Sequence, residues 1–266
     1  MSMKKVLLFA AAAVFVAGCS SVPITGRSQF NMVSDSEVNA LSFQSYDELI
    51  ATSKVVKTGT NATLVKTVGQ KIAVAAEAFL KEHGLEAEIA NYKWEFNLID
   101  SPEINAFCMP GGKIAVYTGI LPVTKNAEGL AVVLGHEVGH AIAKHAAERM
   151  SQQQMTDMGA TVLGAATANK DAQTQQIAQI AFGLGSQVGV ILPYSRKHEL
   201  EADKIGVILM ARAGYNPNYA VVFWQDMSAA TGGASGGIFA THPSDAKRIA
   251  DIQKALPEAL KYYNGK

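Results

Sequence analysis

Cysteine, net charge and long apolar runs are all scarce in this sequence of 266 residues. Its two cysteines, Cys19 and Cys108, cannot form the disulfide framework that stabilises many small secreted domains. The 23 basic and 23 acidic residues balance, so the charge gives no indication of nucleic-acid binding. Two apolar segments, 6–17 and 158–168, are too short to cross a bilayer as helices. A hydrophobic content of 48% nevertheless indicates a globular chain, and the length allows one large domain or two small ones.

The first 18 residues are typical of a bacterial lipoprotein signal peptide. Two lysines precede an apolar segment of secretory length, which ends in Val-Ala-Gly before Cys19. We predict cleavage before Cys19, lipidation of Cys19, and a tether over 19–33 that leads to the folded part. Ser20 follows the cysteine, as in lipoproteins of the outer membrane, so the predicted location is the bacterial envelope, at the outer membrane facing the periplasm. The alternative is a plain signal peptide with a chance cysteine.

A His-Glu-x-x-His motif is the strongest chemical signal. Four residues advance an α-helix by about 400°, so His136 and His140 lie one turn apart on one face, where two imidazoles can bind one metal ion. Glu137 follows the first histidine, where its carboxylate can take a proton from an activated water. The helix-forming run 128–150 is apolar, and burying these side chains without a partner would be costly. The alternative is a helix with two buried or capping histidines.

Zinc chemistry of this type needs three protein ligands and an open position, so a third ligand must lie elsewhere. The metzincin pattern requires a histidine at position 146, which is alanine here. His145 points roughly 140° away from the ligand face and is expected to be exposed. Glu199 and Asp203 are spaced i, i+4 on a later helix, whereas Glu201 points away and is expected to be solvated. We therefore expect the third ligand on the face of Glu199 and Asp203.

The hydrophobic pattern predicts an α+β protein that is mainly helical and has a small β-sheet. The elements predicted from spacing, capping and turn residues are helices over 34–52, 62–83, 195–213 and 217–229 and around Arg248, a strand over 92–100, a hairpin of 104–107 and 113–118, and packed, partly mobile helices over 151–189. An edge strand in the hairpin could bind an extended substrate by β-augmentation. The alternative is an ordinary hairpin.

Four elements in this order resemble the zinc metallopeptidase family that includes the CAAX-prenyl endopeptidases, HtpX, BepA and LoiP. They are Ile104–Phe107 with the Pro-Gly-Gly turn, the His136–His140 motif, Glu199–Asp203, and His242-Pro243 with Arg248. The similarity spans about 34–253, and the length and lipobox look most like the LoiP-type lipoproteins.

The resemblance implies a zincin-like fold over a single metallopeptidase domain at 34–266, with the edge strand of the sheet bordering the active-site helix. It also implies that His136, His140 and Glu199 bind one zinc ion per chain and that Glu137 is the general base and then the acid. Asp203 would orient a ligand histidine. Asn105 and Ala106 on the edge strand would hold substrate, and His242 would face the metal. His242 would either aid the transition state or occupy the open metal position.

Together these expectations describe a zinc-dependent endopeptidase of the bacterial cell envelope. Its predicted partners are misfolded or misassembled envelope proteins, bound in extended form, and a membrane reached through the lipidated Cys19, with no nucleic acid. Partners in envelope assembly or among other proteases have no signal in the sequence. The alternative function is a zinc-containing chaperone-like or binding lipoprotein with latent or no proteolytic activity. A metal-dependent amidase acting on cell-wall peptides is a third class.

Overall fold

The computed structural model describes residues 19–22, 25–187, 191–231 and 246–265. The chain divides into two compact units: unit 1 comprises Met1–Ser34 and His145–His198, and unit 2 comprises Asp35–Lys144 and Glu199–Lys266. Most of the described residues are helical, and a small sheet of mixed strand direction lies in unit 2. The predicted α+β class with mainly helical content is therefore confirmed, whereas a single domain at 34–266 stays a prediction.

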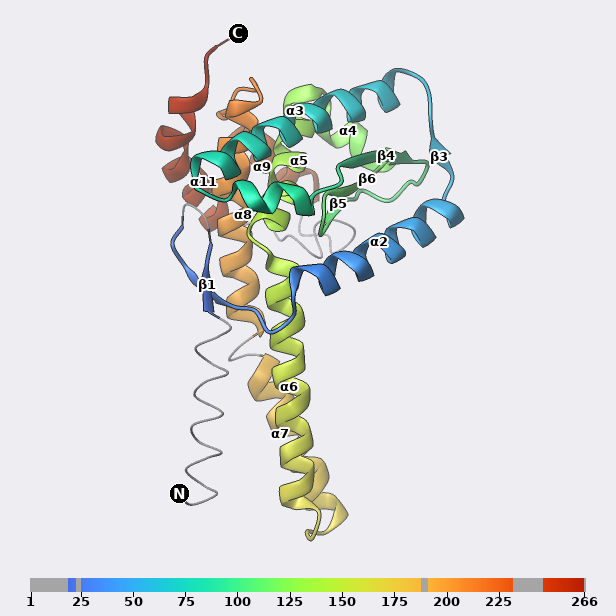
Figure 1. The fold of residues 1–266 in the computed structure, drawn as a ribbon, viewed down its shortest axis with the longest axis vertical. Helices are drawn as coiled ribbons and strands as arrows, with labels where there is room; N and C mark the ends of the chain where they lie inside the picture. The colour runs from blue at the N-terminus through green and yellow to red at the C-terminus, as the bar shows by residue number, and fades with distance from the viewer. Residues whose placement is uncertain (1–18, 23–24, 188–190, 232–245, 266) are drawn as a thin grey trace. The chain divides into compact units, whose positions relative to one another are not determined.

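Helices make up most of both units (Figure 1). Their bounds are α2 (Asp35–Thr52), α3 (Thr60–Glu82), α4 (Leu121–Thr124), α5 (Ala127–Ile142), α6 (His145–Thr167), α7 (Ala172–Ser186), α8 (Leu192–Arg212), α9 (Tyr219–Thr231) and α11 (Ala246–Ala259), with 3-10 turns η1 (Glu86–Asn91), η2 (Thr118–Ile120) and η4 (Leu260–Tyr262). The five helices predicted outside the metal motif and the 151–189 stretch correspond to α2, α3, α8, α9 and α11. Among the described residues, no helix combines the length and the apolar character needed to cross a membrane.

The sheet of unit 2 has the strand order β3-β4-β6-β5. Its strands are β3 (Val55–Val56), β4 (Glu95–Ile99), β5 (Ala106–Met109) and β6 (Lys113–Tyr117). β4 and β6 run parallel, whereas β5 pairs with β6 as an antiparallel hairpin, as the Pro-Gly-Gly turn predicts. Gly111 and Gly112 have φ values of 76° and 83°, a region that residues with a Cβ rarely adopt. The turn therefore requires glycine, and β5 is the last strand of the sheet among the described residues.

Helices cover both faces of this sheet. On one face, Tyr46 of α2 packs against Ile99 and Ala115, and its hydroxyl donates a hydrogen bond of 2.7 Å to the backbone oxygen of Ile114. Alternate residues of a strand point to opposite faces, so Phe96 faces the other way, against α3. There α3 also packs on α5, and α5 packs on β5. The helix that carries the His-Glu-x-x-His motif thus packs on β5.

The predicted single helical run over 128–150 is wrong, because it forms two helices. α5 ends at Ile142, and Lys144 adopts a φ of 54°, which interrupts regular helical backbone. α6 begins at the next residue and packs against α7. The predicted packed helices over 151–189 correspond to the later part of α6 and to α7, but α7 contains no buried residue.

Unit 1 is held together at the start of α6. Both guanidinium N–H groups of Arg27 donate to the carboxylate of Glu148, at 2.8 and 2.7 Å, and His198 Nε2 lies 2.8 Å from the same carboxylate. The ring of His198 stacks on that of His145 with centroids 4.1 Å apart. The segment 19–33, predicted as a tether, contains Arg27 and pairs β1 (Cys19–Ser21) with β2 (Ser28–Phe30).

The expectation that His145 is exposed is wrong. Its exposed fraction is 0%, since the helix is interrupted at Lys144 and the angle extrapolated from α5 no longer applies.

Candidate metal centre

Two helices of unit 2 approach each other closely enough for their backbones to touch. A Cβ added to Gly139 of α5 would lie 2.7 Å from the backbone oxygen of Ala202 on α8, and one added to Gly206 would lie 2.8 Å from the carbonyl carbon of Gly135. Small residues at these positions permit the approach, because a side chain on either helix would separate them. The facing turns of α5 and α8 carry the motif residues.

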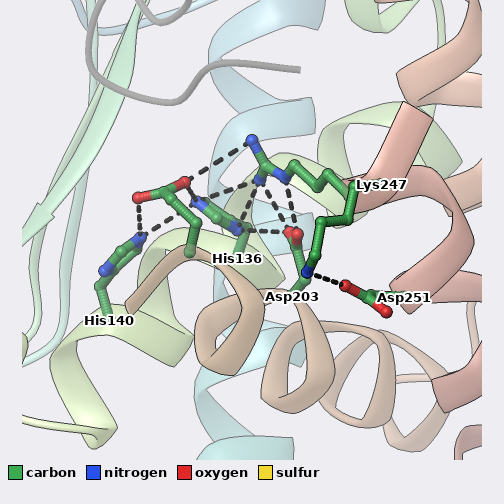
Figure 2. A network of polar contacts seen from close by, with 7 residues as sticks. His136, His140, Asp203, Lys247 and Asp251 are labelled. Carbon is green, nitrogen blue, oxygen red and sulfur yellow. Dashed lines mark hydrogen bonds and ion pairs between the residues drawn. The ribbon is translucent and has the colours of Figure 1, made fainter. Parts of the chain in front are cut away.

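Three side chains predicted as ligands converge between these helices. Ligand atoms of His136, His140 and Glu199 lie within 4.8 Å of one another, and all three residues are buried. Each imidazole Nε2 lies 3.3 Å from a Glu199 oxygen, and the two Nε2 atoms are 3.1 Å apart. Figure 2 shows His136 and His140 side by side. Two imidazole nitrogens and one carboxylate oxygen facing a common point fit the donor set of a catalytic zinc site.

Asp203 and Arg248 form a buried ionic layer behind His136. His136 Nδ1 is 2.8 Å from Asp203 Oδ1, on the side away from His140 (Figure 2). Arg248 of α11 donates to both Asp203 oxygens, from Nε at 2.6 Å and from Nη2 at 2.8 Å. Its Nη1 also lies 3.5 Å from Glu199 Oε2. A carboxylate that accepts a hydrogen bond from Nδ1–H leaves Nε2 available for a metal.

Burial and charge act against each other in this layer. Burial favours a neutral carboxyl group at Asp203, but Arg248 and His136 outweigh it and lower the pKa of Asp203 to about 2. Burial and Arg248 both disfavour a charged His136, yet Asp203 and Glu199 raise the pKa of His136 to about 9. Both shifts favour an anionic Asp203 behind the imidazole, in ion pairs with Arg248 and His136.

Arg248 rests on an aromatic ring from a further helix. Its guanidinium carbon lies 3.6 Å from the centre of the Trp224 ring in α9, and both side chains are buried. The indole also meets the His136 ring edge-on, with centroids 6.0 Å apart. Sequence analysis connects Arg248 to the site only through the family resemblance and does not identify Trp224. A tryptophan spaced by helical periodicity looks like any core residue, so no pattern could have distinguished it.

Comparison with known proteins gives one family. The chain matches the sequence model of peptidase family M48 over residues 64–256. This chain belongs to peptidase family M48. The prediction of a metalloendopeptidase is confirmed by this match and by the names of its relatives.

The M48 relatives come from several organisms. The mitochondrial metalloendopeptidase OMA1 of Schizosaccharomyces pombe is 35% identical over 90% of this chain and 66% of its own length. The mitochondrial metalloendopeptidase OMA1 of Homo sapiens is 31% identical over 90% of this chain and 46% of its own length. The β-barrel assembly-enhancing protease of Escherichia coli K12 is 29% identical over 60% of this chain and 34% of its own length. The chain thus spans about a third to two thirds of these relatives.

The predicted location at a bacterial outer membrane is wrong. Five M48 relatives, from fission yeast, Arabidopsis, cattle, budding yeast and human, are named as mitochondrial proteins. The predicted signal peptide at 1–18 lies outside the described residues, and Cys19 is the first residue of β1. The resemblance to the wider family is confirmed by the M48 match, whereas the particular likeness to LoiP-type lipoproteins and the lipidation of Cys19 stay predictions.

The predicted site residues outside the ligand cluster are Glu137 on α5, Asn105 and Ala106 at the start of β5, and His242. Glu137 is buried on α5, and burial together with its negative charge raises the pKa of the Cys108 thiol on β5. Ala106 begins β5 and is buried, and the amide oxygen of Asn105 accepts a hydrogen bond of 2.9 Å from the backbone N–H of Ala106. His242 lies outside the described residues.

The expectation that Glu201 is solvated is wrong. Its exposed fraction is 5%, because α8 is enclosed on several sides rather than on the ligand face alone. Residues Ala202, Ile205, Val207 and Ile208 of the same helix are also buried and point in different directions around it. Helical spacing predicted the direction of Glu201 relative to Glu199, but the environment on that side depends on other elements.

Proposed function

We propose that this chain is a zinc-dependent endopeptidase in which His136, His140 and Glu199 hold one zinc ion. The convergence of these three buried side chains between α5 and α8 carries the proposal. Three protein ligands leave one position open, which is the arrangement of catalytic zinc sites and not of structural ones. Zinc in such a site supplies the Lewis acidity that activates water and polarises a carbonyl group.

The chain's own groups would carry the proton. Glu137 follows His136 directly on α5, next to the proposed ligands, and its side chain is buried. In that place it would accept the proton of the attacking water and then donate it to the leaving amine nitrogen. Asp203 would keep the His136 ring oriented, since its oxygen lies 2.8 Å from Nδ1.

An extended polypeptide is the substrate that the sheet accommodates best. β5 is the last strand in the order β3-β4-β6-β5 and pairs on one side, with β6. A substrate strand could add to its other side through backbone hydrogen bonds. Because α5 packs on β5, such a strand would pass in front of the ligand set. Asn105 and Ala106 stand at the start of β5, where they would contact the substrate backbone.

Misfolded or misassembled proteins are the substrate class we propose. Backbone pairing at a strand edge needs an unfolded segment and places little demand on its sequence. The Escherichia coli relative is named as a protease that enhances β-barrel assembly, which supports a role in protein quality control. Two proposals rest on the sequence alone: a membrane link through Cys19, and no nucleic-acid partner.

The test is digestion of casein by the full chain, with bound metal counted. Glu137→Gln removes the proton acceptor but no proposed ligand, so we expect one zinc ion per chain and a loss of cleavage by at least about 10³-fold. The matched control is Glu86→Gln, an exposed glutamate, which should cleave as the unchanged chain does. Undiminished cleavage by Glu137→Gln would refute the mechanism. One bound zinc without chelator-sensitive cleavage in the unchanged chain would favour a binding or chaperone-like protein.

The third ligand has a test of its own. Glu199→Ala should lose stoichiometric zinc, because two imidazoles alone bind it weakly. Glu201→Ala is the control, since this residue is also buried but lies outside the ligand cluster. If only the Glu201 variant loses zinc while both variants remain folded, the assignment of Glu199 is wrong.

A further inference from the structure

Trp224 lies directly behind the metal centre and belongs to none of the sequence motifs. It is buried, with 1% of its surface exposed, and it is the largest of the fully buried side chains among the described residues. One face of its ring carries Arg248 at 3.6 Å, and its edge region meets His136 at 6.0 Å between centroids, with an interplanar angle of 68°. Trp224 thus contacts both the ligand histidine and the cation that supports it.

The position of Arg248 matters because it can bond to two competing partners. Its Nη2 donates to Asp203 at 2.8 Å and also lies 3.1 Å from His136 Nδ1. Arg248 therefore bonds to the carboxylate that contacts His136 and also reaches the imidazole itself. A shift of the guanidinium would change both contacts, so its position affects how the ligand ring is held.

The indole limits how the guanidinium can move. Hydrogen bonds to Asp203 act in the guanidinium plane and leave its faces unconstrained. The Trp224 ring contacts one face, and a cation over an aromatic ring in a water-free site is held more strongly than at an exposed one. The aromatic face thus holds the guanidinium in the place where Nε and Nη2 both donate to Asp203, the carboxylate that contacts His136 Nδ1.

We propose that Trp224 is a positioning residue, whose aromatic face holds Arg248 on Asp203 and so keeps in place the carboxylate that orients the ring of His136. The proposal rests on the metal centre under "Proposed function" but not on proteolysis. Its test measures metal affinity on the Glu137→Gln background, so a failure of the peptidase assignment would appear in the casein digest and would leave this measurement intact.

The most discriminating experiment lowers the electron density on the face of the Trp224 ring and keeps the shape of the ring. The chain has two tryptophans, so Trp94→Phe leaves Trp224 as the only one. Trp94 is half-buried, stacks on Tyr92 and donates to Glu77, and neither of these partners is a proposed ligand. Mono-, di- and trifluorotryptophan would then be incorporated at 224, because each fluorine withdraws charge from the ring face and weakens its attraction for a cation. Zinc affinity would be measured by competition with a chromophoric chelator.

We expect the zinc Kd to rise stepwise with each fluorine, to about tenfold for the trifluoro ring, a change of about 1.4 kcal/mol. The melting temperature of the metal-free protein should change little across the series, since the ring volume is nearly constant. A Kd that is the same for all four rings would overturn the proposal and leave Trp224 as a packing residue.

A pair of ordinary variants gives a second readout. Trp224→Phe retains an aromatic face and should keep zinc affinity within about threefold, whereas Trp224→Leu retains only apolar volume and should weaken it by at least about tenfold. Trp94→Leu is the control for loss of an indole elsewhere and should leave the Kd unchanged. Equal zinc affinities for the Phe and Leu variants at 224, with both folded, would contradict a role for the aromatic face.

Discussion

Helices α5 and α7 are both rich in alanine and glycine but have opposite environments. α5 is buried on nearly every side, and α7, which also contains several glutamines, has no buried residue. The difference shows that a high content of small residues does not by itself determine burial. What matters is whether the small residues of a helix meet another backbone.

Glycines make the difference measurable. Gly139 of α5 faces the backbone of Ala202, and a Cβ there would lie 2.7 Å from its oxygen. Gly183 and Gly185 of α7 would have nothing within 4 Å of an added Cβ among the described residues. In α5 the glycines therefore allow contact, whereas in α7 they only lower the helix propensity.

Gly139→Ala should have the largest effect. Because the clash is with backbone, α5 and α8 would have to separate, and we expect a loss of about 3 kcal/mol in the free energy of unfolding together with weaker zinc binding. The matched change, Gly183→Ala, should raise the free energy of unfolding by about 0.5–1 kcal/mol, since alanine favours the helix and meets nothing. Denaturant unfolding and zinc counting check both. Changes of the same sign would remove the distinction between the two helices.

Glu148→Gln tests how unit 1 is stabilised at the start of α6. Burial alone would raise the pKa of Glu148, but His198 and Arg27 lower it to about 2. A lowered folded-state pKa means that the carboxylate stabilises the fold fully above its ordinary pKa of 4.5 and loses this contribution as the pH falls toward 2. We expect the Gln variant to lose about 1–2 kcal/mol at pH 7 and to show less dependence on pH between 4.5 and 2.

The control for the contact between Arg27 and Glu148 is an arginine–carboxylate contact at the surface. Glu82 pairs with Arg212, but 53% of its side chain is exposed. Glu82→Gln should therefore cost less than about 1 kcal/mol at pH 7. If the two variants lost equal stability at every pH, the buried position of Glu148 would add nothing to the free energy of unfolding.

Ile180→Gln should have the smallest effect. This side chain lies on α7 with an exposed fraction of 55%, so its replacement should change the free energy of unfolding by less than about 0.5 kcal/mol. Ile72 of α3 is the matched buried isoleucine, and Ile72→Gln should cost more than about 3 kcal/mol. A comparable loss for Ile180→Gln would mean that α7 is covered in solution and would end the contrast with α5.

Local patterns predicted much of the site. His136 and His140 come together because they are four residues apart on one helix, and the same spacing placed Glu199 and Asp203 on one face of α8. The hairpin turn was also a local feature. These predictions needed no knowledge of which elements pack together.

The predictions that failed depended on contacts between distant segments or on a single backbone angle. The burial of Glu201 depends on elements packed around α8, and that of His145 on the interruption at Lys144. The contact between Trp224 and Arg248 joins α9 to α11, and neither residue is marked by a local pattern as facing the other. Helical spacing predicts the direction of a side chain, but the environment in that direction belongs to the whole fold.

The ligands come from two stretches of the chain that are neighbours in space. Residues 145–198 lie between these stretches in the sequence, and all of these residues belong to unit 1. The cation site is thus completed within unit 2, and the intervening stretch works as an insertion between its two halves. Insertions of this kind can lengthen, shorten or diverge at modest cost, because closing a longer loop adds little entropy. Descendants of this chain can therefore acquire new surfaces there while the chemistry of the centre is inherited unchanged.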